Sequence, residues 1–296
     1  MPSSIQSLSN LIVVPGIPAV SLLVWTKWFV GRLDKRSRRP FDDMPRPAGW
    51  SLQGRMEDLM SEFTLFFMMA MMTGAVAWAV SFSKPDGAGL FLTAGFLACS
   101  ILFWKSAKII LRYGNLRLGY LGEQVVGQVL DRLSSDSIRV FHDLEVLEPG
   151  KKPWNIDHVV VTPAGVFAIE TKCRRKPRGS APDGQQGHKV IFDGHELRFP
   201  APMQADRHGL EQAERNANWL SDKLTALNGT PIPITPVLVL PGWWVDATGK
   251  GPVTVLNPKR LPGFLTGRKT VFSDQQFRAI SSQLEERCRI DLSRPA

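Results

Sequence analysis

The chain has 296 residues, of which 44% are hydrophobic, and it carries a formal net charge of +9. This length accommodates one or two domains, and the positive charge suits a chain that meets nucleic acid or an anionic membrane surface. The three cysteines, Cys99, Cys173 and Cys288, are scattered and form no Cys-x-x-Cys pair, which argues against a disulfide framework and against a zinc site.

Apolar residues are concentrated in the first third of the chain. Phe63–Phe82 and Gly87–Trp104 contain no charged side chain, and each is long enough to cross the hydrocarbon core of a bilayer as a helix. The joint between them, Ser83–Gly87, is rich in turn formers, so the two stretches are expected to form a helical hairpin. A weaker third span is expected at about Leu8–Val30, where two prolines would kink the helix or leave it partly re-entrant.

The distribution of basic residues sets the expected orientation. Seven Lys and Arg lie from Arg32 to Arg55 and four from Lys105 to Arg117, whereas the hairpin turn carries one lysine opposite one aspartate. The positive-inside rule therefore predicts a multi-pass protein of the inner (cytoplasmic) membrane with its C-terminal domain in the cytoplasm. Residues 1–112 form the expected membrane region, and residues 31–60 within it are expected to be an irregular basic loop that touches anionic lipid.

Residues 113–296 are expected to form one cytoplasmic domain of mixed helices and strands. Gly119–Leu133 has apolar residues at helical spacing, which predicts a helix. Glu123 lies near the expected start of this helix, where the helix dipole alone would favour an acid. A strand is expected next, at Ile138–Leu147.

The central stretch of the domain is Ile156–Lys172. Two apolar runs, Val159–Val161 and Val166–Ile169, flank the turn-forming residues Pro163–Gly165. This pattern predicts a β-hairpin, and its many β-branched residues favour a position in the middle of a sheet.

Three charged side chains lie at the open end of this hairpin. Folding at the turn brings Asp157 close to Glu170 and Lys172, and the latter two project from the same face because they are two residues apart. Adjacent carboxylates repel each other, and a divalent cation such as Mg²⁺ (or Mn²⁺) removes this conflict. Lys172 would then position the attacking water and counter charge on a phosphate. Glu-x-Lys alone is common on solvated strands as a weak ion pair. The interpretation as a metal site therefore depends on Asp157 lying on the same hairpin as Glu170 and Lys172.

The spacing of an aspartate, twelve residues and then Glu-x-Lys resembles the PD-(D/E)XK nuclease superfamily. The residues from Ile156 to Lys172, Ile-Asp-His-Val-Val-Val-Thr-Pro-Ala-Gly-Val-Phe-Ala-Ile-Glu-Thr-Lys, are similar to one branch of it, the NERD (nuclease-related) domain, and the resemblance extends over about residues 119–240. It implies a restriction-endonuclease-like α/β core, a mixed sheet flanked by helices, preceded here by an all-α transmembrane region.

The resemblance also implies roles for individual residues. Asp157 and Glu170 would bind the metal, and Lys172 would act on the water. Gly122-Glu123 matches a feature of NERD domains, so Glu123 is expected to face the metal as a further acid. Gln212 matches a glutamine on the helix after the hairpins and is expected to orient the site, although on spacing alone it would be an ordinary polar residue.

A dense basic cluster follows the hairpin directly and consists of Arg174, Arg175, Lys176 and Arg178. A solvated loop is the default interpretation of such a run. Its position beside the expected metal site favours contacts with a phosphate backbone, which are independent of sequence and sensitive to salt.

The remaining pattern predicts further elements that close the domain. They are a hairpin at 189–199 with an Asp-Gly turn, a helix at 203–227 that begins in earnest near Gly209, strands at 235–240 and 253–256, and helices at 261–265 and 273–287. Their order indicates a mixed sheet flanked by helices.

Two functions of different class remain open. The first is a membrane-anchored, Mg²⁺-dependent nuclease that hydrolyses nucleic acid, with DNA favoured over RNA. The alternative is a non-catalytic, membrane-tethered module that binds nucleic acid or acts as a scaffold. A third hypothesis is a membrane sensor or assembly protein whose hairpin spans carry the function. A transport or proton path through these spans lacks support, because 63–82 and 87–104 contain no charged residue.

Overall fold

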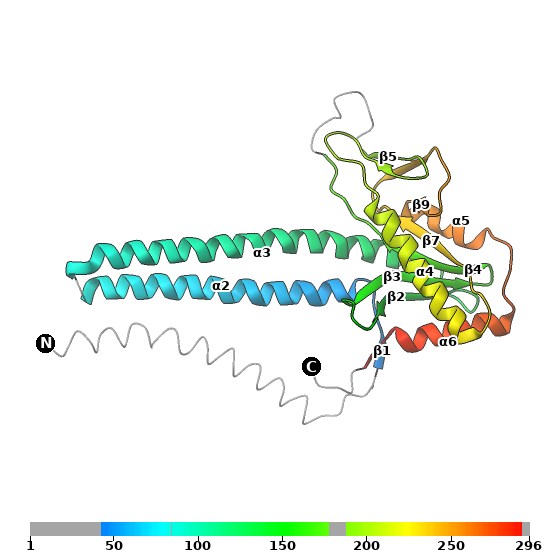
Figure 1. Ribbon diagram of the computed structural model, residues 1–296, viewed down its shortest axis with the longest axis horizontal. Coiled ribbons are helices and arrows are strands. Elements are labelled where there is room, and N and C mark those ends of the chain that lie inside the picture. Colours follow the sequence, from blue (N-terminus) through cyan, green and yellow to red (C-terminus); the bar gives the residue numbers. More distant parts are fainter. Residues whose placement is uncertain (1–42, 84, 178–187, 292–296) are drawn as a thin grey trace. The chain divides into compact units, whose positions relative to one another are not determined.

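The computed structural model describes residues 43–83, 85–177 and 188–291, and Figure 1 shows its elements. These residues divide into two compact units. One is a helical hairpin at 55–115, and the other joins residues 43–54 to residues 116–291. The third span expected at Leu8–Val30 lies outside the described residues.

The helical hairpin consists of α2 (Trp50–Ser83) and the first part of α3 (Ala88–Asp131), connected through a 3-10 turn at Pro85–Gly87. Both helices are long enough and apolar enough to cross a membrane. Small residues bring them together: a Cβ on Gly95 would lie 2.2 Å from Ala77 Cβ. Large apolar side chains such as Phe82, Leu90 and Phe96 point outward and are exposed, which is unlike the core helix of a water-soluble domain.

The helix boundaries differ from those expected. Helix α2 already begins at Trp50, so the prediction of an irregular loop is wrong for residues 50–60, which are helical. Helix α3 continues without a break to Asp131 and includes the helix that was expected to start separately at Gly119. Glycines inside the apolar and polar stretches of α3 do not end it, because single glycines cost a helix only about 1 kcal/mol each.

The second unit is built on a five-stranded mixed sheet with the order β2–β3–β4–β7–β9. The first three strands are antiparallel, and β7 and β9 continue the sheet parallel to β4. The strands are β2 (Arg139–Val146), β3 (Trp154–Thr162), β4 (Gly165–Thr171), β7 (Ile234–Val239) and β9 (Thr254–Leu256). The predicted central hairpin, β3–β4, is thus confirmed and occupies the middle of the sheet.

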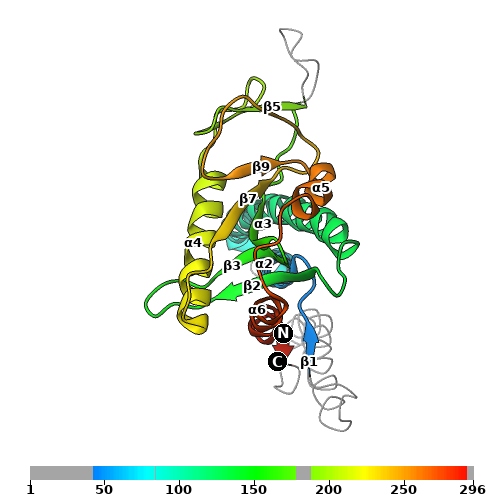
Figure 2. The ribbon, with the colours of Figure 1, turned by 90° about the vertical axis from the view of Figure 1, so that its right-hand side faces the viewer.

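Helices cover both faces of this sheet, as predicted. Helices α4 (His208–Asn228) and α6 (Asp274–Arg287) pack on one face around residues such as Val159 and Ala168. The end of α3 and the short helix α5 (Leu261–Thr266) pack on the other face, around Phe167 and Val237. Figure 2 shows α4 and α5 on opposite sides of the strands.

Two smaller sheets complete the unit. The predicted Asp-Gly hairpin forms β5 (Lys189–Phe192) and β6 (Leu197–Arg198), with Gly194 at φ 101°, and β5 also pairs in parallel with β8 (Trp244–Ala247). Strand β1 (Asp43–Pro45) pairs antiparallel with β10 (Arg289–Asp291). The sequence analysis did not anticipate β1, β8 or β10, which are short and pair with distant segments.

Candidate active site at the end of the central hairpin

The register of the central hairpin brings the two predicted metal-binding acids together. The β3–β4 ladder ends with His158 opposite Ile169, so the next position along each strand places Asp157 across from Glu170. There, Asp157 Oδ2 accepts the backbone N–H of Thr171 at 2.7 Å. A side-chain carboxylate thus takes the place of a backbone acceptor at the point where the strands separate.

Lys172 lies at the centre of a hydrogen-bonded network that includes Glu170. Its Nζ lies 2.8 Å from Glu170 Oε1 and donates to Gln212 Oε1 at 2.9 Å. The contact with Glu170 agrees with the prediction that the two side chains share a face of the strand. Helix α4 can approach this closely because Gly209 has no side chain: a Cβ there would lie 3.1 Å from Lys172 Cγ.

The second oxygen of Glu170 is bonded from the same helix. Asn216 Nδ2 donates to Glu170 Oε2 at 3.0 Å, and its own Oδ1 accepts from Trp154 Nε1 at 3.2 Å. Asn216 and Glu170 are both 1% exposed, so these bonds are sheltered from water. The sequence analysis did not assign Asn216 to the site. Its position one helical turn after Gln212 was the available signal.

Glu123 reaches the site from the other side of the sheet. Helix α3 passes close to the end of β4 at Gly122, where a Cβ would lie only 2.9 Å from Cys173 Cβ. Glu123 is 7% exposed and lies in the last third of α3, far from its first turn at Ala88. The expectation that Glu123 lies near the start of a helix is therefore wrong, and a helix dipole does not account for an acid there.

Burial raises the pKa values of all three carboxyl groups, and repulsion from neighbouring carboxylates adds to it for Glu123 and Asp157. Burial is the largest cause for Glu123, whose pKa rises to about 8, and the charges of Asp143 and Glu170 add to it. The pKa of Asp157 is raised well above its ordinary value by burial and then by Glu170 and Glu123. Burial also raises the pKa of Glu170, against the opposing charge of Lys172. The three carboxyl groups therefore lie where too little positive charge is present to stabilise them all in the ionised form.

Lys172 does not remove this deficit, but it stays charged. Burial acts to lower the pKa of Lys172, yet the carboxylates of Glu170, Asp157 and Glu123 outweigh it, so the pKa is raised above its ordinary value. At neutral pH the side chain is an ammonium ion, which can donate hydrogen bonds and offset negative charge but cannot accept a proton.

Comparison with known families matches this part of the chain: the model of the nuclease-related domain, NERD, covers residues 118–241. The chain contains a NERD domain. Its matched residues run from the last part of α3 to the end of β7 and include Glu123, Asp157, Glu170, Lys172 and Gln212. Curated proteins and solved structures give no significant match to the chain.

The ligand chemistry of the NERD domain fits a hard divalent cation. Mg²⁺ is commonly held by one or two carboxylates with waters completing its shell, and Asp157 and Glu170 provide such a pair. A cation between them would also relieve the repulsion by Glu170 that raises the pKa of Asp157. Within the described residues, no group of three or more His, Cys, Asp or Glu is placed to hold one ion, so a ligand role for Glu123 stays a prediction.

The basic cluster beside the site is only partly exposed. Arg174 forms an ion pair with Asp206 and lies over the ring of Phe199, with 5.0 Å between the guanidinium carbon and the ring centroid. Arg175 and Lys176 are exposed on the loop after β4. Arg178 lies outside the described residues. Nucleic-acid contact by this cluster therefore stays a prediction. Arg175 and Lys176, which are exposed, are the members best placed to make such contacts.

Asp143 is a further acid that the sequence analysis left out of the site. It is 1% exposed, and its φ of 53° is in the left-handed region, which is unusual for a residue other than glycine. Its carboxylate accepts the backbone N–H of Ser51 and the side-chain amide of Asn155. Its charge contributes to the raised pKa of Glu123. An aspartate in the middle of a strand gives no sequence signal of this conformation.

Proposed function

We propose that this protein is a membrane-anchored, divalent-metal-dependent nuclease that hydrolyses phosphodiester bonds of nucleic acid, with DNA as the favoured substrate. The proposal rests on one observation at the end of the central hairpin of a NERD domain: Lys172 bonds both Glu170 and Gln212, and Asp157 bonds the backbone N–H of Thr171, which lies between Glu170 and Lys172. Asp157, Glu170 and Lys172 are the residues whose spacing resembles the PD-(D/E)XK pattern, and Gln212 is the residue that the NERD resemblance added to them.

Asp157 and Glu170 would hold the cation, with Glu123 beside them. A bound Mg²⁺ or Mn²⁺ supplies Lewis-acid activation of water and neutralises charge on the phosphate. The Lys172 ammonium would orient the water and donate to the phosphate oxygen on which negative charge increases. Gln212 accepts a hydrogen bond from Lys172 and so fixes the direction of its ammonium group. Asn216 fixes the carboxylate of Glu170 in the same way.

Two features support the substrate and the location. Residues 105–296 contain 27 Lys and Arg against 20 Asp and Glu, a net of +7, which favours a polyanion. The outward-facing apolar side chains of α2 and α3 suit a lipid environment, and the basic residues that flank the two spans favour a cytoplasmic position for the NERD domain.

The test is cleavage of single- and double-stranded DNA and RNA by the full chain in detergent, with Mg²⁺, Mn²⁺ or EDTA. The variants Glu170→Gln and Lys172→Met are compared with Glu286→Gln, which neutralises an exposed acid on α6. We expect metal-dependent cleavage that falls at least about 100-fold in both site variants and is unchanged in the control. DNA binding, measured by anisotropy in EDTA, should persist in Glu170→Gln.

The alternative is a non-catalytic module that binds nucleic acid or acts as a scaffold at the membrane. It predicts binding without cleavage for the wild-type chain under every metal condition. It also predicts that Glu170→Gln behaves like Glu286→Gln in every assay. Either result would replace the nuclease proposal.

A further inference from the structure

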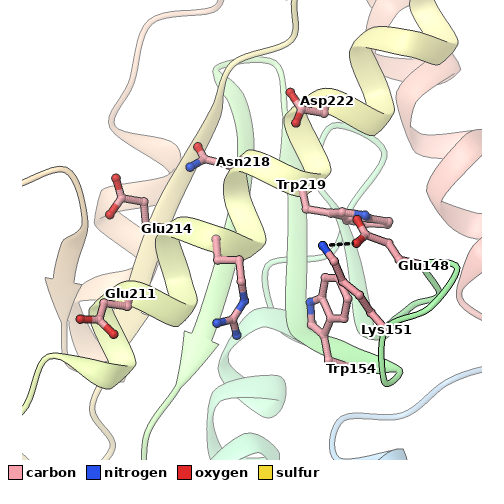
Figure 3. A pocket seen from close by; sticks show the side chains of 9 residues that line it. Glu148, Lys151, Trp154, Glu211, Glu214, Asn218, Trp219 and Asp222 are labelled. Carbon is pink, nitrogen blue, oxygen red and sulfur yellow. Dashed lines mark ion pairs between the residues drawn. The ribbon is translucent and has the colours of Figure 1, made fainter.

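A groove of about 460 Å³ lies along α4 and adjoins the active-site network through one residue, Trp154, which lines the groove and bonds Asn216. One wall is α4 itself, and the other is the connection from β2 to the start of β3. Figure 3 shows the side chains that line it. They comprise two indoles, four carboxylates, two cations and one amide, the last being Asn218.

The charge of this groove is opposite in sign to that of the domain around it. Four carboxylates face two cations, Lys151 and Arg215, a local net of −2, whereas residues 105–296 carry a net of +7. A groove of this sign repels a phosphate backbone and attracts a cation. The four carboxylates belong to Glu148, Glu211, Glu214 and Asp222.

The two indoles add a second, independent preference for a cation. Trp154 and Trp219 meet edge to face, with ring centroids 6.3 Å apart and an interplanar angle of 71°. Both are partly buried against the main core, and Trp154 is held further by its bond to Asn216. Tryptophan gives the strongest cation–π attraction of the aromatic residues, and it does so best where its ring is held still and partly shielded from water.

The chain already places an ammonium group in this groove. Lys151 Nζ lies 2.6 Å from Glu148 Oε2, and the side chain of Lys151 is 66% exposed. Figure 3 shows it extending past Trp154 toward Glu148. Lys151 lies on an exposed turn directly after Gly150, whose φ is 75°. Another cation could therefore replace the Lys151 ammonium group beside Glu148.

We infer that this groove binds a lysine- or arginine-rich segment of a protein partner. One cationic side chain would lie against the indoles of Trp154 and Trp219, and neighbouring cations would pair with Glu214 and Asp222 along α4. This site goes beyond the nuclease function and does not depend on it, because it uses none of the residues that would hold metal or water.

The test uses the full chain in uncharged detergent with EDTA. The probe is a fluorescein-labelled nonapeptide of alternating arginine and serine, and the matched probe has glutamate in place of arginine. Anisotropy titrations compare the wild-type chain with Trp219→Ala and with Glu214→Gln/Asp222→Asn. Trp219 is half-buried against the core, so the double variant, whose two positions are exposed, keeps the test valid if Trp219→Ala does not fold. The controls are Trp244→Ala, which removes a tryptophan 52% exposed elsewhere on the domain, and Glu286→Gln.

We expect the arginine peptide to bind and the glutamate peptide not to bind. Trp219→Ala and the double variant should each weaken binding about tenfold, and the controls should leave it unchanged. Equal binding of the arginine peptide by the wild type and the double variant would overturn the inference. A single-stranded oligonucleotide that displaces the peptide, and itself binds less well to Trp219→Ala, would also overturn it and assign the groove to nucleobases instead.

Discussion

Lys172 and Glu170, two residues apart on one strand, form an ion pair of 2.8 Å in which the carboxylate is 1% exposed and the ammonium side chain 30% exposed. The pair is therefore asymmetric: the acid is enclosed, and its cationic partner borders the solvent. Removing the lysine would leave this buried carboxylate without its ion-pair partner, although Asn216 would still donate a hydrogen bond to it.

We predict that Lys172→Met makes the stability of the chain more dependent on pH. Without the ammonium group the pKa of Glu170, already raised, rises further, so the folded state holds a proton that the unfolded state releases. Stability is then lost as pH rises above the unfolded value of about 4.5. Chemical denaturation in detergent should show a loss of about 1–3 kcal/mol at pH 8 and a smaller loss at pH 5.

Lys223→Met is the matched control, since it removes an exposed lysine from α4. It should change stability little at either pH. Equal losses at pH 5 and pH 8 in Lys172→Met would contradict the electrostatic explanation and indicate lost packing instead.

Metal binding should require Asp157. Calorimetry of the full chain with Mg²⁺ and Mn²⁺ should detect a site that Asp157→Ala abolishes and that Asp136→Ala, at an exposed aspartate, preserves. Affinity should increase from pH 6 to pH 8, because burial raises the pKa values of Asp157, Glu170 and Glu123, and their protons must leave when the cation binds. Identical isotherms for the wild type and Asp157→Ala would exclude this site.

Glu123 should lower the stability of the metal-free chain as pH rises. Its folded pKa of about 8 lies above the unfolded value of 4.5, so the unfolded state ionises first. The contribution of Glu123 to the free energy of unfolding is therefore greatest below pH 4.5, decreases between pH 4.5 and about 8, and is constant above that. In EDTA, the unfolding free energy of Glu123→Gln should therefore decline less steeply over this range than that of the wild type. Parallel curves would show that Glu123 is not buried as described.

The close approach of α3 to the end of β4 should not tolerate a methyl group. Gly122→Ala would place a Cβ 2.9 Å from Cys173 Cβ, and we expect a loss of about 1–3 kcal/mol in unfolding free energy. Gly263→Ala in α5 meets open space and should stabilise by up to about 1 kcal/mol, as alanine does in helices. If both variants are stabilising, α3 must pack less closely here.

The parts of the fold that were predictable from sequence are those set by local pattern. The β3–β4 hairpin follows from two β-branched runs and a turn, and its register alone places Asp157 opposite Glu170. The face shared by Glu170 and Lys172 follows from strand alternation. Helix α4 was also predictable from local pattern, because its apolar residues recur at helical spacing.

The remainder depends on contacts between distant segments. Gln212 lies 40 residues from Lys172, so only the resemblance to NERD domains, and not spacing, connected the two. The continuity of α3 could not be read because its glycines resemble helix ends, although packing keeps the helix intact. Asn216 and Asp143 acquire their positions from the packing of α4 and from an unusual backbone conformation, which no short window of sequence specifies.

The pairing of β1 with β10 means that the unit with the five-stranded sheet contains chain from before and after the helical hairpin. Pro45 pairs with Arg289, and Arg46 N–H donates to the backbone oxygen of Cys288 at 2.8 Å. During synthesis, β1 therefore leaves the ribosome before α2 and α3 and cannot pair until β10 follows. The unit can be completed only after both apolar helices have been made, so its final folding follows their synthesis. A protein expressed from residue 116 onward would lack its first strand from the outset.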